Sequence, residues 1–389
     1  MADSLQKLPE ILLSYAQNIT KFKFDVSQHV YKVNNSFNLS AIQELKSFKI
    51  DTFKKLSQSV LILITSLKNE QVIMKLDNNL ELADKKQLKQ QQLPFSSSFS
   101  VGTAVYKNHL LISLDGKLLI LNQELDMIGE VSLEIPKNAD NILVYQDKAF
   151  LLDNVVEPIF ILQADLTQLE QPRILEKIEL YGTNIHLKQQ WLNPQLNHWY
   201  VIKTSATQEA STESILTFSM DKNIKEKSSQ LIFHQSFSEE SSLAASQDYQ
   251  IIDITQLPPT WAIIQKEDDK KLYLTKMATK EFVSFNDVYP EGFIDFNETL
   301  ELSSLFDYCS SEIGELVTYQ NQGILKQYEN KLFIILVITA VNKNWQITFQ
   351  ESKLLVVDVT DSPHIIINQP IDELKCDISS VSSLALELN

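Results

Sequence analysis

Two segments that lie far apart in the sequence share a strand–turn–strand pattern. Residues 158–180 and 353–370 each contain an apolar run that ends in an aspartate, Asp165 or Asp358, then a short polar turn and a second apolar run. Short apolar runs bounded by Asp, Ser and Pro are typical of β-strands joined by turns. The pattern therefore predicts a repeat built of strands.

Similar groups of short strands recur along the chain at intervals of about 40 to 45 residues. The clearest group spans residues 101–133, where Asp115-Gly116 supplies the positive φ of a two-residue hairpin turn. Six such groups are visible in the sequence. A seventh group would come from the less regular segment 288–322, or from strands at both chain ends that complete one sheet and so remove its free edges. Four antiparallel strands at this interval predict an all-β fold, a β-propeller of seven blades.

The two ends of this regular region follow other patterns. Residues 4–20 place apolar side chains three and four residues apart, which predicts a short amphipathic helix. Residues 84–94 are polar and glutamine-rich, as in a solvated loop. We expect an N-terminal helix over residues 1–20 and a single β-propeller domain over residues 21–389, with an irregular insertion near 288–322.

One blade carries a family resemblance. Residues 354–363, Leu-Leu-Val-Val-Asp-Val-Thr-Asp-Ser-Pro, resemble the repeat of LVIVD-type β-propellers, and residues 160–165 with Pro172 are a looser copy. The resemblance implies a propeller fold. That family has no single activity, so the resemblance implies no catalytic residues.

The composition narrows the classes of partner. The chain has 34 Lys and Arg against 50 Asp and Glu, so its net charge is 34 − 50 = −16, and its average field repels phosphate backbones and anionic lipid. Arg173 is the only arginine, which removes most bidentate recognition of phosphate or carboxylate. We therefore expect no nucleic-acid partner.

Glycine and cysteine are scarce. Seven glycines are few for a propeller, so Asn, Asp and Lys are expected at many turns. The two cysteines, Cys309 and Cys376, are too few for a disulfide framework or a cysteine-built zinc site. The N-terminal residues lack the apolar core of a secretory signal, and the sequence contains no uncharged apolar stretch long enough for a membrane span. These features predict a cytoplasmic protein.

The best local candidate for a ligand site contains His186, Trp191, His198 and Trp199. Two imidazoles can bind a metal or move protons, and two indoles can form a stacking wall for a sugar or aromatic ligand. The competing interpretation is a structural role, since Trp199 precedes Val201 and Ile202 in an apolar strand. We predict no metal and no cofactor.

Three aspartates, Asp253, Asp295 and Asp358, end apolar strands. Their carboxylates are expected to bond turn amides or, alternatively, to line a propeller channel. The glycine loops of P-loop and Rossmann enzymes are absent from the sequence, and so are the common nucleophile and metalloprotease motifs.

Three functions remain open. The first is a non-enzymatic, scaffold-like interaction module that holds a protein partner, because a propeller presents many loops on one face. The second is a propeller enzyme, a hydrolase, lyase or cyclase acting on a small organic substrate in a central channel. The third is carbohydrate binding, which needs Trp191 or Trp199 exposed.

Overall fold

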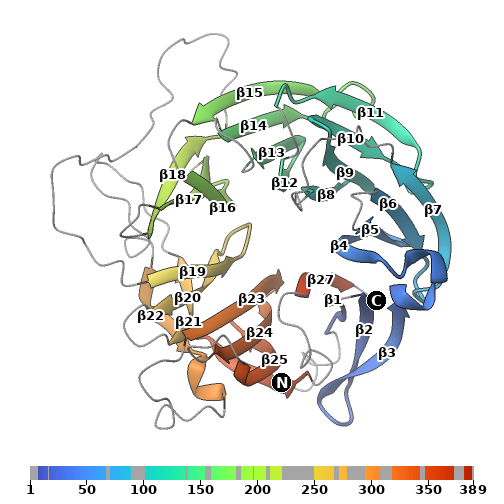
Figure 1. Cartoon of the computed structure of the whole chain (residues 1–389). Helices are drawn as coiled ribbons and strands as arrows, with labels where there is room; N and C mark the ends of the chain where they lie inside the picture. Colours follow the sequence, from blue (N-terminus) through green and yellow to red (C-terminus); the bar gives the residue numbers. More distant parts are fainter. Residues whose placement is uncertain are drawn as a thin grey trace, which may run out of the picture. The chain divides into compact units, whose positions relative to one another are not determined.

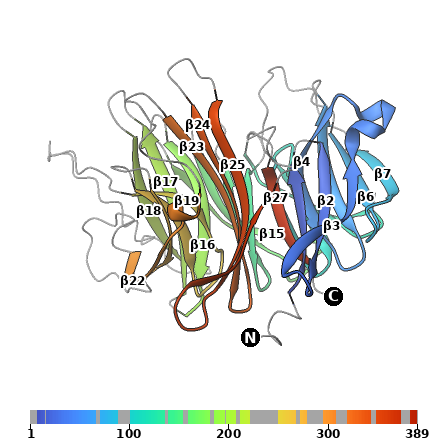
Figure 2. The ribbon, with the colours of Figure 1, turned by 90° about the horizontal axis from the view of Figure 1, so that it is seen from below.

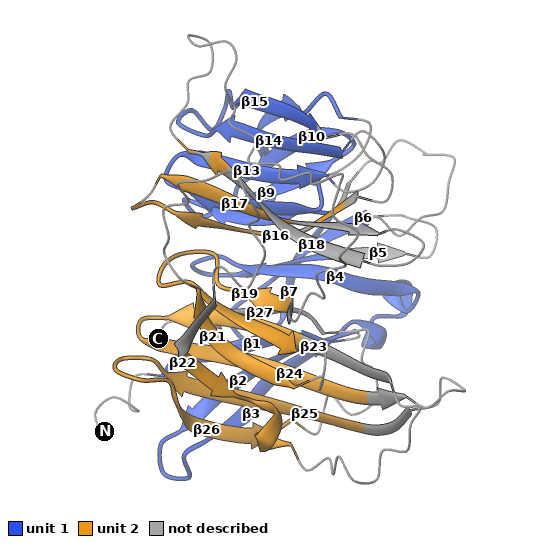
Figure 3. Ribbon diagram, turned by 90° about the vertical axis from the view of Figure 1, so that its left-hand side faces the viewer, with its two compact units in different colours: residues 1–182, 379–389 blue, residues 183–378 orange. Residues whose placement is uncertain are grey.

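The computed structural model describes most of the chain as two compact units (Figure 3). The described residues are 8–15, 17–66, 71–88, 101–135, 139–153, 159–180, 185–195, 197–206, 211–220, 249–266, 271–277, 294–306, 318–341, 347–371 and 381–387. Unit 1 comprises residues 1–182 and 379–389, and unit 2 comprises residues 183–378. Since residues 379–389 belong to unit 1, that unit contains both chain ends.

Unit 1 has four antiparallel sheets of four strands, labelled in Figure 1. Three short 3-10 helices occur in the described chain, η1 (Leu39–Ala41) and η2 (Gln43–Leu45) in this unit and η5 (Ser303–Leu305) in unit 2. The sheets of unit 1, in strand order, are β27 (Val381–Glu387), β1 (Glu10–Tyr15), β2 (Asn18–Asp25), β3 (Val30–Asn38); β4 (Phe48–Lys55), β5 (Val60–Ser66), β6 (Gln71–Leu76), β7 (Leu82–Leu88); β8 (Thr103–Tyr106), β9 (His109–Leu114), β10 (Lys117–Leu121), β11 (Met127–Ser132); and β12 (Asn141–Tyr145), β13 (Lys148–Asp153), β14 (Ile159–Asp165), β15 (Arg173–Leu180).

Unit 2 has two sheets of four strands and one of three. Figure 2 shows the long strands β23, β24 and β25 of the last sheet side by side. The sheets of unit 2 are β16 (Ile185–Asn193), β17 (His198–Ala206), β18 (Ser211–Ser219); β19 (Tyr249–Ile254), β20 (Trp261–Lys266), β21 (Leu272–Met277), β22 (Ile294–Glu301); and β23 (Thr318–Tyr328), β24 (Lys331–Val341), β25 (Ile347–Asp358), β26 (His364–Pro370).

The middle strands are apolar at successive positions because both faces of a sheet are covered. In β5, Ile62 packs into the core shared with sheet β27-β1-β2-β3, whereas Leu61 and Leu63 pack into the core shared with sheet β8–β11. Side chains alternate between the two faces of a strand, so a strand between two cores needs apolar residues throughout. Unit 2 repeats this arrangement: Ile263 and Ile264 of β20 belong to two different cores.

The prediction of strands around residues 101–133 is confirmed. The segment forms β8 to β11, and Asp115 and Gly116 have φ values of 51° and 67° in the β9–β10 turn. Positive φ at both central residues is typical of the two-residue turn that joins the strands of a tight hairpin. The expectation that Asn, Asp and Lys take turn positions in place of glycine is also confirmed: Lys107, Asn108 and Asn197 adopt positive φ in the described turns.

The prediction of an N-terminal helix over residues 1–20 is wrong for the residues that the structure describes. Residues 10–15 and 18–25 are strands, and β1 pairs with β27 through Ile11↔Leu386 and Leu13↔Leu384. Ile11, Leu12 and Leu13 are all buried, which suits a strand covered on both faces better than a one-sided helix. A strand that is apolar at successive positions also has apolar residues three and four apart, so this spacing does not distinguish it from a helix. Residues 1–7 lie outside the described part.

Repeated four-stranded antiparallel sheets, one of them built from both chain ends, make this an all-β protein with a β-propeller fold. Six blades have four strands each. The sheet β16-β17-β18 has three in the described residues, and the strand expected at residues 231–234 lies outside them, so the count of seven four-stranded blades stays a prediction. Within segment 288–322, the described residues form β22, η5 and the start of β23.

Candidate functional site

The turns between the third and fourth strands of five sheets share one hydrogen-bonding pattern. An aspartate or asparagine at the end of the third strand accepts a hydrogen bond from the backbone N–H two residues later, a turn that these two side chains favour. The bonds are Ser27 N to Asp25 (2.9 Å), Asn79 N to Asp77 (2.8 Å), Glu124 N to Asn122 (3.0 Å), Thr167 N to Asp165 (2.9 Å) and Thr360 N to Asp358 (2.9 Å). The two segments that predicted a repeat therefore occupy equivalent places in their sheets.

Two of these turns in unit 1 carry a leucine where glycine would be expected. Leu80 and Leu125 have φ values of 63° and 65°, and their backbone N–H groups donate to the carbonyl oxygens of Asp77 (3.0 Å) and Asn122 (3.2 Å). The left-handed conformation is unfavourable for leucine by about 1 kcal/mol. Leu80 is buried in the core that Ile62 of β5 joins, and Leu125 is buried in the core that Leu61 and Leu63 join. This burial holds the β6–β7 and β10–β11 turns in place.

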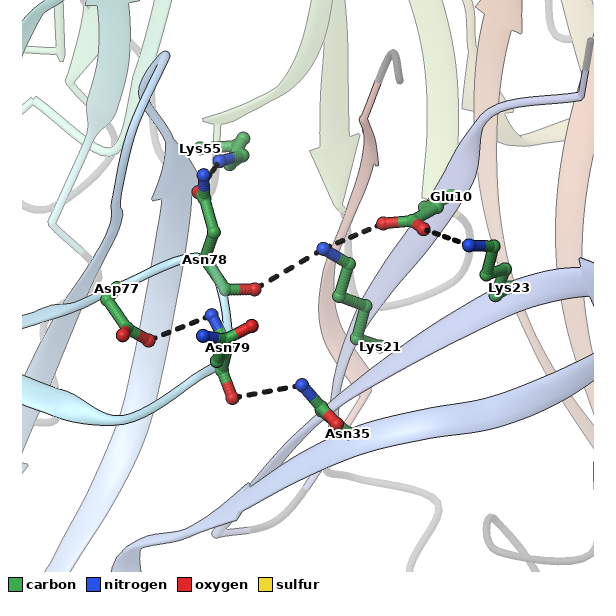
Figure 4. A network of polar contacts seen from close by, with 8 residues as sticks. All are labelled: Glu10, Lys21, Lys23, Asn35, Lys55, Asp77, Asn78 and Asn79. Atoms are coloured by element: carbon green, nitrogen blue, oxygen red, sulfur yellow. Dashed lines mark hydrogen bonds and ion pairs between the residues drawn. The ribbon is translucent and has the colours of Figure 1, made fainter.

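The β6–β7 turn is also held by side chains from the preceding sheet and from β4 (Figure 4). Lys21 Nζ donates to the Asn78 carbonyl oxygen (3.3 Å), and Lys55 Nζ donates to Asn78 Oδ1 (2.6 Å). Asn35 Nδ2 donates to the Asn79 carbonyl oxygen (3.2 Å). Three strands, β2, β3 and β4, thus fix a turn that belongs to β6 and β7.

A buried ion pair positions Lys21. Its ammonium lies 2.7 Å from Glu10 Oε2, and the two residues are only 7% and 5% exposed. In Figure 4, Lys23 reaches the other carboxylate oxygen of Glu10, at 3.9 Å. Removing one member of a buried pair leaves an uncompensated charge, so Glu10 and Lys21 depend on each other.

The next turn is held in the same manner. Lys86 of β7 donates to the Leu125 carbonyl oxygen (2.5 Å), and its ammonium lies 4.0 Å from Asp126 Oδ1. This bond places β7 beside the β10–β11 turn. The lysines around both turns are therefore engaged by backbone or side-chain oxygens.

Apolar and acidic side chains stay exposed on these two turns. Leu82 is 43% exposed and Met127 is 54% exposed, and they occupy equivalent positions, five residues after Asp77 and Asn122. The residues before them, Glu81 and Asp126, are exposed carboxylates. We call the exposed side chains of Glu81, Leu82, Glu124, Asp126 and Met127 the turn surface.

The turn aspartates titrate below their ordinary range. The Lys32 ammonium and the Ser27 hydroxyl beside Asp25 hold its pKa well below 3.8. Burial opposes ionisation of Asp165 and Asp358, but Thr167 and Arg173 donate to the first, and Thr360 donates to the second, so both pKa values are also lowered. These carboxylates are charged at neutral pH, and Asp358 has the turn role expected of it.

The predicted ligand residues lie in sheet β16-β17-β18 of unit 2. Trp191 is 2% exposed and stacks on Tyr200 with ring centroids 4.9 Å apart. Trp199 is 3% exposed, and its indole N–H donates to Gln190 Oε1 (2.9 Å). Both indoles are therefore covered on the faces that a sugar would need.

The two histidines do not converge. His186 is exposed and pairs with Thr204, whereas His198, six residues from Thr204 along β17, pairs with Asn193. At the rise of a strand, six residues place the backbones of the two histidines about 20 Å apart. His198 Nδ1 lies 3.0 Å from the hydroxyl of Tyr200, whose pKa burial raises to about 12. The ligand-binding role of these four residues stays a prediction.

Asp253 has a different role from the expected turn contact. Its carboxylate accepts hydrogen bonds from Leu325 N of β23 (2.7 Å) and from Gln189 Nε2 of β16 (3.0 Å). Burial raises its pKa, against the opposing effects of Lys326 and these donors. One carboxylate thus joins three sheets of unit 2. The side chain of Asp295 lies outside the described side chains.

No group of three or more His, Cys, Asp or Glu in the described residues is arranged to hold a metal ion. No helix among those residues is long and apolar enough to cross a membrane.

No protein-family model matches the sequence, and no curated protein matches it. Solved structures with a similar chain trace include an apocarotenoid oxygenase mutant from Synechocystis, at 10% identity over 98% of this chain and 93% of that one, with a TM-score of 0.49. The β-propeller domain of Cps50 (Swd1) from Myceliophteria thermophila has 9% identity over 81% and 96%, and a TM-score of 0.40. The WD40 domain of Pan2 from Neurospora crassa has 8% identity over 68% and 72%, and a TM-score of 0.39. None of their activities is assigned to this chain.

Proposed function

We propose that this protein is a non-enzymatic interaction module that holds a protein partner on the turn surface of unit 1. The observation that carries the proposal is the pair Leu82 and Met127, two large apolar side chains exposed at equivalent positions of neighbouring turns. Single exposed apolar residues are common on protein surfaces, whereas repeated ones on adjoining turns favour a contact site.

The rigidity of the two turns supports the same function. Each is fixed by an Asp or Asn side chain, by a buried leucine and by a lysine from a neighbouring strand. A surface that is already ordered loses little conformational entropy when a partner binds. Its apolar side chains are therefore presented at low entropic cost.

Site-specific cross-linking tests the proposal. A photoreactive amino acid at Leu82 or Met127 is expected to capture one protein in cells that naturally express the chain, and the same group at Val33, which is 48% exposed on β3, is not. The captured protein is then purified and titrated against the wild type and the double variant L82S/M127S. Binding that the double variant weakens about tenfold or more, with V33S unchanged, supports the proposal.

Two results would count against it. Capture of chaperones alone would mean that the turn surface has no specific partner. Equal affinity of the wild type and L82S/M127S for the captured protein would place the contact elsewhere. The enzymatic alternative, the carbohydrate alternative, the LVIVD resemblance, the cytoplasmic location and the single propeller domain over residues 21–389 stay predictions.

A further inference from the structure

We infer that Met127 is a modification site, where a hydroperoxide oxidises the thioether to a sulfoxide and thereby weakens partner binding at the turn surface. The oxidation follows from the exposure of this side chain and from the chemistry of sulfur. Its effect on a partner rests on the proposed function.

Met127 differs from the other described methionines in its access to solvent. The chain has five methionines, and all but Met1 lie in the described residues. Met127 is 54% exposed, whereas Met74, Met220 and Met277 are 0%, 5% and 5% exposed. Because an oxidant must reach the sulfur, a peroxide in solution should select Met127 among these four.

The reaction needs only the thioether and a hydroperoxide such as hydrogen peroxide. A lone pair of the sulfur attacks one peroxide oxygen, a sulfur–oxygen bond forms, the oxygen–oxygen bond breaks, and the second oxygen leaves as water. The sulfur is oxidised by two electrons and the peroxide is reduced by the same two. Methionine sulfoxide reductases reverse this change, so the site can be switched in both directions.

The β10–β11 turn does not depend on the Met127 side chain. The backbone N–H of Asn122 donates to the Asp126 carbonyl oxygen (2.9 Å), and the Asp126 N–H donates to Asn122 Oδ1 (2.8 Å). Buried Leu125 fixes the turn from below. Oxidation therefore changes the chemistry of the surface while the turn keeps its conformation.

Oxidation removes one of the two apolar side chains of the turn surface. Met127 becomes a polar, chiral sulfoxide, whereas Leu82 has no group that a peroxide oxidises. A partner that covers position 127 would then bury a polar oxygen, and this burial is unfavourable unless the partner offers a hydrogen-bond donor. Binding through an apolar contact should therefore weaken.

Peptide mass spectrometry after treatment with hydrogen peroxide measures the selectivity. In the folded protein we expect Met127 to react at least about tenfold faster than Met74, Met220 and Met277. In urea the four rates should become similar, because unfolding exposes the three buried side chains. Similar rates in the folded protein, or a slower reaction at Met127, would overturn the inference. Unchanged thermal unfolding after oxidation of Met127 shows that the fold is retained.

The matched control for the effect on binding is M127L, which keeps an apolar side chain that peroxide does not oxidise. The affinity of the cross-linked partner is measured for each protein before and after peroxide treatment. Treatment should weaken binding of the wild type about fivefold, and the two sulfoxide reductases, one for each epimer, should restore it. For M127L the treated and untreated affinities should be equal. An equal loss in M127L would place the sensitive group elsewhere and overturn the inference.

The variants also separate this inference from the proposed function. If L82S/M127S weakens binding but oxidation of Met127 does not, the turn surface is a contact site and its regulation by oxidation is wrong. If cross-linking captures chaperones alone, the proposed function fails and the effect on a partner fails with it. The mass spectra still decide, in that case, whether Met127 is the site of oxidation.

Discussion

Gly129 of β11 lies against the backbone of Leu169 in the next sheet. A Cβ built on Gly129 would be 1.9 Å from the Leu169 carbonyl oxygen, which belongs to the β14–β15 turn. This contact joins the last strand of one blade to a turn of the following blade in unit 1. It leaves no room for any side chain at position 129.

We therefore expect G129A to lower the free energy of unfolding by about 3 kcal/mol, because the backbone of the neighbouring turn must move. The matched control is G323A, where the nearest atom to a built Cβ is the end of the Ile263 side chain at 3.1 Å. That side chain can rotate, so the change should be below about 1 kcal/mol. Urea unfolding measures both, and equal effects would contradict the contact with Leu169.

The buried leucine with positive φ predicts an unusual order of variants at position 125. L125A and L125G both lose the packed side chain, at a cost of about 3 kcal/mol. Glycine, however, adopts the left-handed conformation without the steric cost that a Cβ imposes. L125G should therefore be more stable than L125A by about 1 kcal/mol. At Leu121, which is buried in extended β10, alanine should be the more stable of the two. The opposite order at position 125 would show that its backbone is not constrained.

The Glu10–Lys21 pair predicts a strong coupling between two variants. K21M removes the closer of the two ammonium groups beside the buried Glu10 carboxylate and leaves only Lys23, at 3.9 Å. The unfolding free energy should therefore fall by about 3 kcal/mol. The variant E10L/K21M buries no charge at this position and should recover part of that loss. A double-mutant cycle measures the coupling energy. Additive effects of E10L and K21M would mean that the two side chains do not interact.

The turn carboxylates predict a loss of stability in acid. Asp165 and Asp358 have pKa values below the ordinary 3.8 in the folded protein, so the unfolded chain takes up protons first as the pH falls. Their stabilising contribution is complete above that ordinary value and is lost as the pH falls through the folded pKa values. D165N/D358N keeps an oxygen acceptor but does not titrate there. Its unfolding free energy should therefore fall less steeply between about pH 5 and pH 2, as followed by circular dichroism.

Local patterns predicted the strands whose partners are near in sequence. The Asp115-Gly116 hairpin and the two segments ending in Asp165 and Asp358 appear as expected, because turn chemistry and apolar runs are local signals. The strand at residues 10–15 is an exception, since it pairs with the adjacent β2 as well as with β27. It was missed because both of its faces are buried, so its continuous apolar run also fits the spacing of a helix. Residues 84–88 were expected to be a loop, yet they belong to β7. This is an outer strand whose side chains at residues 84–86 are exposed, which suits a polar sequence.

Whether the predicted ligand residues lie close together depends on the register of the paired strands, which composition does not reveal. His186 and His198 are close in sequence, but strand pairing places them at opposite ends of β16 and β17. In contrast, Leu82 and Met127 are 45 residues apart in sequence, and only their place after Asp77 and Asn122 makes them equivalent. Aligning the chain on an Asp or Asn that ends the third strand of each group would have found this relationship.

The pairing of β27 with β1 has a consequence for synthesis in the cell. Ile11 leaves the ribosome long before Leu386, its partner in the finished sheet, so the edge of β1 lacks β27 for most of translation. Nascent chains grow at about 5 to 20 residues per second, which makes this interval tens of seconds. Until the last strand emerges, an apolar edge that the complete protein hides is open to chaperones and to other nascent chains.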